Sequence, residues 1–258
     1  WQETQAASGQ TGEIHFPLIL FQFSDVEFLE DDPVQTFSDL YSKQGYAAEG
    51  YTGSVRDYFY DNSDGVFDPV FDVYGPYTLS KPQAEYASSR DILGRKAFSE
   101  AATLAAADVD ASLYDSNHDG AIDFALFVFA GRSRAEGGGE NTIWPTLLTS
   151  ELQGSGLRVK CCASASELYG PSGNDLCGVG PVSFEIGLYI GLPPLYDVNG
   201  SGLGLSGGMS YFSLMASGCY IDKGRTPPYL TMEERICAGW NRESEYGTLS
   251  GNTVVPPI

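Results

Sequence analysis

The sequence predicts an α/β or α+β domain, because strand-like and helix-like segments alternate along it. Residues 15–23 and 122–130 are short apolar runs rich in β-branched and aromatic residues, which is typical of buried strands. Residues 88–108 lie between them, are rich in alanine and contain no proline, which favours a helix. A chain of 258 residues with 42% hydrophobic content can also bury a sizeable core.

The remaining elements follow from local signals. Residues 1–13 are polar and contain glycine, so we expect a loose lead-in. Residues 35–48 predict a short helix, and Ser54 is expected to cap a second helix with its hydroxyl. Residues 66–79 are aromatic and β-prone, but prolines interrupt them, which predicts short strands. Glycine-rich loops are expected at residues 131–142, 170–180 and 199–208.

The charge balance limits the classes of partner. The chain carries 34 acidic and 14 basic residues, for a net charge of −20. Phosphate backbones are bound chiefly by Lys and Arg, so we expect no nucleic-acid partner. An acidic excess suits a protein that holds calcium with carboxylates, although most of these residues are expected to form a solvated surface. The sequence contains no apolar run long enough to predict a membrane span.

The cysteines give little support to a thiolate zinc site, because none forms a Cys-x-x-Cys pair. Their odd number leaves at least one of them unpaired or bonded to another chain. A disulfide from Cys161 or Cys162 to Cys177 is one alternative, and buried free thiols are expected for at least some of the five. The five cysteines are at positions 161, 162, 177, 219 and 237.

The most informative segment is residues 184–197, Phe-Glu-Ile-Gly-Leu-Tyr-Ile-Gly-Leu-Pro-Pro-Leu-Tyr-Asp. It resembles the active-site helix and following turn of the M6-type, immune inhibitor A-like, secreted metallopeptidases, whose pattern is His-Glu-x-Gly-His-x-x-Gly-Leu-Pro-Asp-x-Tyr-Asp. The resemblance implies a metzincin- or zincin-like domain with a twisted mixed sheet, a helix in the active-site position and a mainly irregular C-terminal subdomain. Apolar residues alternate strictly over residues 182–192, which alone predicts a strand. We follow the resemblance and expect a helix.

The resemblance also implies that the zinc ligands are lost. Phe184 and Leu188 stand where the family has its two histidines, and Pro194 stands where it has the aspartate. None of these side chains has a lone pair for a metal, so we expect a degenerate site with no zinc and no catalytic residue. Glu185 keeps the identity of the family's general base. Without metal-bound water to activate, it is expected to be a hydrogen-bonded or exposed carboxylate rather than a relic base.

Other fragments match the family in the same order, from about residue 15 to about residue 240. Residues 143–146 resemble an Ile-Trp-Pro-His segment with Thr146 in the His position, and residues 213–218 resemble the methionine-containing turn beneath the metal. The resemblance implies a lead-in at 1–13, a peptidase-like domain at 14–240 and the start of a following region at 241–258. It also implies a secreted or cell-surface protein, presumed bacterial.

A calcium loop is predicted at residues 115–123. Oxygen-bearing side chains stand at positions 1, 3, 5 and 9 of an EF-hand-type spacing, with Gly120 at position 6 and a backbone carbonyl available at position 7. Position 12 is Leu126, so a bidentate ligand would have to come from elsewhere. An Asx-rich turn before the strand is the alternative. The predicted ligands are Asp115, Asn117, Asp119, Ala121 and Asp123.

Three functions are compatible with the sequence. The first is a catalytically inactive peptidase-like domain that binds a peptide, protein or glycan or serves as a scaffold. The second is a hydrolase with a non-standard site, since Gly204-x-Ser206-x-Gly208 formally matches a nucleophile elbow. His15 and His118 are the only histidines available as its base, and we expect the match to be coincidental. The third is a structural surface protein without a specific ligand.

Overall fold

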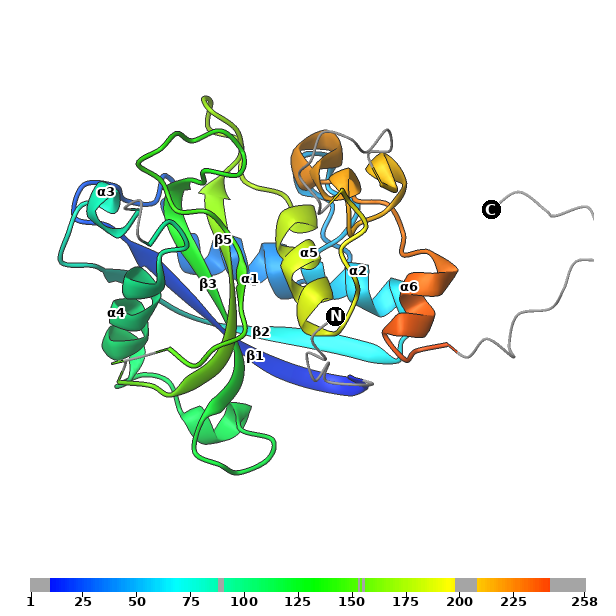
Figure 1. The fold of residues 1–258 in the computed structure, drawn as a ribbon, viewed down its shortest axis with the longest axis horizontal. Coiled ribbons are helices and arrows are strands. Elements are labelled where there is room, and N and C mark those ends of the chain that lie inside the picture. Colours follow the sequence, from blue (N-terminus) through cyan, green and yellow to red (C-terminus); the bar gives the residue numbers. More distant parts are fainter. Residues whose placement is uncertain (1–9, 88–90, 153, 155, 198–207, 242–258) are drawn as a thin grey trace, which may run out of the picture.

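The centre of the molecule is a five-stranded mixed sheet, which confirms the predicted α/β class (Figure 1). The computed structural model describes residues 10–87, 91–152, 154, 156–197 and 208–241. Neighbouring strands are parallel, except that β4 runs antiparallel to β5 at one edge. The order across the sheet is β2 (Phe67–Thr78), β1 (Gly12–Gln22), β3 (Ile122–Arg132), β5 (Val159–Leu168) and β4 (Leu147–Leu148).

The two predicted buried strands are β1 and β3, and both are covered on each face. In β3, Phe124, Leu126 and Val128 enter one hydrophobic core, whereas Ala125, Phe127 and Phe129 enter the other. Successive side chains of a strand point to opposite faces, so a continuous apolar run is what a strand covered on both sides requires.

Helices cover both faces of the sheet (Figure 1). Helix α4 (Arg95–Ala105) packs on one face, where Phe98 lies against Phe127. The other face is covered by α1 (Pro33–Ser42), α2 (Val55–Asn62) and α5 (Val179–Tyr189). The shorter elements are η1 (Ala48–Gly50), α3 (Gln83–Tyr86), η2 (Ala111–Tyr114), η3 (Ser210–Phe212), η4 (Ser217–Gly224) and α6 (Met232–Cys237).

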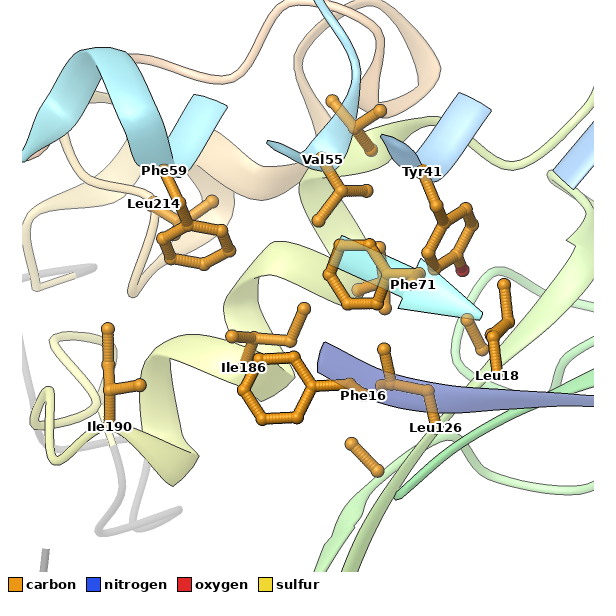
Figure 2. Packing of buried hydrophobic residues seen from close by; sticks show 14 of the residues in the cluster. Phe16, Leu18, Tyr41, Val55, Phe59, Phe71, Leu126, Ile186, Ile190 and Leu214 are labelled. Atoms are coloured by element: carbon orange, nitrogen blue, oxygen red, sulfur yellow. The ribbon is translucent and has the colours of Figure 1, made fainter. Parts of the chain in front are cut away.

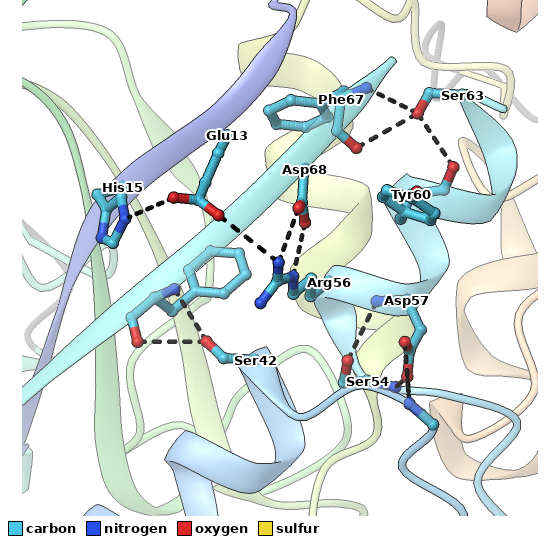
Figure 3. A network of polar contacts seen from close by, with 12 residues as sticks. Glu13, His15, Ser42, Ser54, Arg56, Asp57, Tyr60, Ser63, Phe67 and Asp68 are labelled. Atoms are coloured by element: carbon cyan, nitrogen blue, oxygen red, sulfur yellow. Dashed lines mark hydrogen bonds and ion pairs between the residues drawn. The ribbon is translucent and has the colours of Figure 1, made fainter. Parts of the chain in front are cut away.

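Helix α2 shows how local signals and tertiary contacts agree. Ser54 and Asp57 form a capping box at its start, as the sequence predicts for Ser54. Arg56 then forms a two-point ion pair with Asp68 of β2, through Nε at 2.6 Å and Nη2 at 2.7 Å (Figure 3). Glu13 of β1 lies 3.8 Å from the same guanidinium, so the network fixes α2 against two strands.

Two of the predicted elements are wrong in extent. The segment predicted at 66–79 forms one continuous strand, β2 (Phe67–Thr78), rather than several short ones. Because β2 is the last strand on its side of the described sheet, its prolines need not donate to a neighbour there. The helix expected at 88–108 begins only at Arg95, because Gly94 has a φ of 70° and Asp91 accepts from the first backbone N–H groups.

Smaller differences concern the N-terminal part of the chain and β5. The helix expected at 35–48 is α1, which begins at Pro33 behind the capping side chain of Asp32. Residues 12–13 of the expected lead-in already belong to β1, whereas residues 1–9 lie outside the described part. Strand β5 was not predicted. Its cysteines and serines are weaker strand signals than the aromatic runs of β1 and β3.

Candidate functional site

Helix α5 forms one wall of the candidate site, and its two apolar faces explain the alternating sequence. Val182, Ile186 and Ile190 follow one another at four-residue spacing and are buried in the core (Figure 2). Phe184 and Leu188 lie about 200° away around the helix and line a surface cavity instead. Two ridges on opposite faces of a helix therefore produce a pattern with the period of a strand.

Close backbone contacts hold α5 against the C-terminal segment, where Figure 1 shows it between β5 and the orange turns. A Cβ on Gly180 would lie 2.1 Å from the carbonyl oxygen of Cys219, so a larger residue would force η4 away. A Cβ on Gly187 would lie 2.6 Å from Sδ of the buried Met215. These glycines set the distance between α5 and the turns that complete the cavity.

The cavity has a volume of about 330 Å³ and brings together three of the four predicted site positions, Phe184, Glu185 and Leu188. Pro194 is exposed on the loop after α5 and does not line it. Thr146, at the position where the family has a histidine, lines the same cavity. No three His, Cys, Asp or Glu side chains of the described residues form a group that could hold a metal. The side chains here do not fit a zinc ion.

Glu185 is the most unusual group in the cavity wall. Its side chain is only 9% exposed, and the backbone N–H of Leu147 in β4 donates to its carboxyl group. The other oxygen, Oε2, is buried without a hydrogen-bond partner. Burial, and then the negative charge of nearby Glu136, raise the pKa of Glu185 to about 8. With this pKa the carboxyl group of Glu185 is mostly protonated at pH 7, and its Oε2 atom lacks a hydrogen-bond partner.

Glu136 supplies a second carboxyl group to the same cavity. It lies in the glycine-rich loop that follows β3, is half-buried, and accepts a long hydrogen bond of 3.5 Å from the hydroxyl of Ser166. Burial raises the pKa of Glu136 to about 7. None of the described residues that line the cavity is basic, so neither carboxyl group has a cationic partner there.

Aromatic side chains surround the carboxyl pair. Trp144, Tyr196 and Tyr220 line the cavity and are between 38% and 47% exposed, so their rings remain available to a ligand. Phe184 packs against Tyr196 with ring centroids 6.1 Å apart. The cavity therefore combines an apolar, aromatic wall with two acidic groups.

The predicted calcium loop adopts a turn that directs its oxygens inward, but an ammonium group lies among them. Lys160 of β5 contacts Asp119 at 2.6 Å, Asp123 at 2.9 Å and Asn117 at 3.3 Å. The carboxylate of Asp115 accepts from the backbone N–H groups of Asp119 and Gly120, and Oδ1 of Asn117 accepts from the N–H of Asp119, two residues on, as in an Asx turn. Ala121 is buried at the start of β3.

The other sequence candidates do not assemble into a site. Residues 204–207 of the formal nucleophile elbow lie outside the described residues. His15 pairs with Asp72 at 2.9 Å, and it lines a separate cavity together with His118, away from Glu185. All five cysteines are free, which contradicts the disulfide alternative; Cys162, Cys177 and Cys219 are buried thiols, as expected for some of them.

A scan against protein-family models gives no match to this chain, and a search of curated proteins finds no similar sequence. Within the described part of the chain, no helix combines the length and the apolar content needed to cross a bilayer.

Sequence reasoning missed two residues that matter here, Glu136 and Lys160. Glu136 had a usable signal, because it follows a predicted strand, and ligands of α/β sheets often bind beyond the carboxyl ends of strands. Lys160 had none, because its strand was not predicted. Both join their partners only through the tertiary fold.

Proposed function

We propose that this chain is a catalytically inactive, zincin-like relative of the M6-type metallopeptidases that binds a peptide or protein ligand in the cavity beside α5. The observation that carries the proposal is the cavity itself. Two positions that hold histidines in the family present a phenyl ring and an isobutyl group to it, while its aromatic walls stay open. The same resemblance supports a secreted or cell-surface location.

Chemistry supports the loss of catalysis. Zinc hydrolases need a metal to lower the pKa of water and to polarise the scissile carbonyl. Phe184 and Leu188 offer no electrons to a cation, and the carboxyl group of Glu185 is engaged by the N–H of Leu147. The cavity retains the shape and apolar lining that a binding site requires.

A metal-gain experiment tests the position of the degenerate site. The double variant Phe184→His with Leu188→His places two imidazoles one helical turn apart on the cavity wall. We expect the double variant to bind about one equivalent of zinc, measured by metal analysis after dialysis. The native chain and each single variant, as controls, should retain far less. A double variant that binds no more zinc than the single variants contradicts the assignment of this helix.

Ligand binding is tested with a blocked cavity. Leu188→Trp adds a bulky ring inside the cavity, whereas Leu104→Trp adds the same ring to an exposed position on α4, on the opposite face of the sheet. On a random peptide array we expect the native chain and Leu104→Trp to bind the same peptides and Leu188→Trp to lose them. Absence of any peptide binding by the native chain refutes the proposal.

Hydrolysis without zinc is the alternative, and the raised pKa of Glu185 favours it over other enzymatic routes, because a carboxylic acid protonated near neutrality can act as a general acid. A casein-type assay with parallel metal analysis separates the two functions. We expect no turnover above that of Glu185→Gln. Turnover by the native chain that this substitution abolishes would replace the binding function with a catalytic one.

We also propose that the ammonium group of Lys160 occupies the oxygen donors of the loop at 115–123 when calcium is absent. Calcium binds to the same donors only by displacing this ammonium group. The donors are hard oxygens, which suit calcium, yet three of them already contact a positive charge. We expect calcium to raise the melting temperature of the native chain only slightly and a chelator to reverse that rise. A large shift would mean that Lys160 does not compete.

A further inference from the structure

The cavity contains a feature that a general peptide-binding surface does not need, a pair of carboxyl groups with no cation beside them. Glu136 enters from the loop after β3, and Glu185 enters from α5. Glu136 is close enough for its negative charge to contribute to the raised pKa of Glu185. Oε2 of Glu185 is buried without a hydrogen-bond partner.

The basic residues nearest to this wall in sequence have other partners. Lys223, within η4, contacts Asp175 at 2.8 Å, and Arg225, directly after η4, contacts it at 3.0 Å, so both of these cations pair with Asp175. Arg134 donates to the backbone carbonyl of Glu140. Residues 198–207, which follow the cavity residue Tyr196, contain no Lys or Arg in their sequence. The described protein therefore provides no internal countercharge for Glu136 and Glu185.

We infer that the ligand supplies this countercharge, as a lysine or arginine side chain of a peptide or protein that lies in the cavity between Glu136 and Glu185. The inference rests on the proposed binding function and specifies the chemistry of its ligand. A neutral ligand would leave both acids unpaired in an apolar wall, which is costly. A cation converts the same two groups into charge-assisted acceptors.

The other walls suit the rest of such a side chain. The aliphatic stem of Lys or Arg buries well against apolar groups, which Phe184, Leu188 and Pro181 provide. Exposed aromatic faces attract ammonium and guanidinium groups, and Trp144, Tyr196 and Tyr220 are available at the mouth. A planar guanidinium can also bridge two carboxylates, which favours arginine over lysine.

Binding should strengthen as the pH rises. Glu136 and Glu185 lose their protons with pKa values of about 7 and about 8, and only the ionised forms pair with a cation. The other titratable groups that face them are Cys177, Cys219, Tyr169 and Tyr220, whose pKa values are all raised. These groups stay neutral between pH 6 and 9, so the carboxyl pair alone sets the pH dependence.

The experiment uses random hexapeptide arrays, followed by calorimetry with matched peptides that differ in one residue. Arginine is compared with citrulline, and lysine with norleucine, so that charge changes while the stem is kept. We expect the charged peptide to bind about tenfold or more tightly at pH 9, with a smaller ratio at pH 6. In the double variant Glu136→Gln with Glu185→Gln the ratio should fall to about twofold or less.

The outcomes separate the two claims. If peptides bind the native chain but citrulline equals arginine, the cationic ligand is refuted and the binding function stands. If no peptide binds, both fail. Glu136→Gln alone guards against misfolding, because this half-buried side chain is held only by a local hydrogen bond with its own backbone and a long one from Ser166. It should lower the ratio while the melting temperature does not fall below the native value.

Discussion

Two buried glutamates, Glu167 and Glu185, differ in how completely the protein satisfies them. Glu167 is fully buried at the end of β5, and its carboxylate accepts from the backbone N–H groups of Leu29 at 2.6 Å and Gly131 at 2.9 Å, with a longer contact to Glu30. Glu185 is nearly as buried but has only the N–H of Leu147, and its Oε2 has no partner.

The contrast separates a structural carboxylate from one that awaits a ligand. Glu167 joins the loop at residues 29–30 to the end of β3, so its hydrogen bonds hold the sheet and its loops together. Because this fold satisfies the buried carboxylate of Glu167 with three backbone N–H groups, it is able to satisfy a buried carboxylate fully. The incomplete shell of Glu185 therefore needs a local explanation, and at the wall of a cavity a buried polar group without a partner is typical of a functional site.

The largest effect is expected at Glu167. Glu167→Gln keeps the shape but removes the charge and turns an amide N–H₂ toward backbone donors. We expect a loss of about 4 kcal/mol in the free energy of unfolding, because charge-assisted bonds are broken and donors are left buried. Urea denaturation at pH 7 measures it. A loss below about 1 kcal/mol would remove the distinction between the two glutamates.

Glu185→Gln should have the opposite effect and raise the free energy of unfolding at alkaline pH. The folded-state pKa of Glu185 is about 8, above the ordinary glutamate value of 4.5, so the folded protein binds an extra proton between these two pH values. The stability from this group is present below pH 4.5 and is lost as the pH rises through about 8. Gln does not ionise, so the stability of the variant relative to the native chain should rise by roughly 3–4 kcal/mol between pH 5 and pH 9.

The control for this profile is Glu136→Gln, at the same cavity. Its pKa of about 7 is less displaced, and its side chain is half-buried, so its pH profile should change in the same direction by a smaller amount. Denaturation curves of all three chains from pH 5 to pH 9 provide the comparison. If the free energy of unfolding of the native chain changed with pH in parallel with that of Glu185→Gln, the pKa of Glu185 would not differ between the folded and unfolded states.

The comparison also shows what sequence could and could not predict. Strands β1 and β3 and the cap at Ser54 are encoded locally, and they were predicted. Helix α5 was expected from its resemblance to a family, while its alternating residues favoured a strand, because periodicity alone cannot reveal two apolar faces. The prolines of β2 led to a prediction of short, interrupted strands. The sequence could not show that β2 lies at an edge of the described sheet, where prolines are tolerated, because strand order depends on the tertiary fold.

The state of the cavity carboxyls could not be predicted for a similar reason. The sequence placed Glu185 between Phe184 and Leu188, but its chemistry depends on Leu147 of β4, which no local signal identified. Glu136 reaches the cavity from a loop whose path is set by β3. Burial, pairing and the pKa values of both acids arise from segments that meet only in the folded chain.

The smallest effect on stability is expected at Lys160. Its ammonium group pairs with acidic side chains from within the protein, in contrast to the backbone N–H groups at Glu167 and the proposed ligand at Glu185. Lys160→Met keeps the stem and removes the charge that contacts Asp119 and Asp123. We expect a loss of about 1 kcal/mol without calcium, because the pairs are partly exposed. Calcium should restore the lost stability in Lys160→Met, because the oxygen donors are then free of the ammonium group. It should add little stability to the native chain, where the ammonium group still occupies them. Thermal unfolding with calcium and with chelator measures both, and Lys81→Met, at an exposed ion pair with Glu85, is the matched control. Equal calcium responses in the native chain and in Lys160→Met would mean that ammonium and calcium do not share these oxygens, and the loop would then be an Asx turn alone.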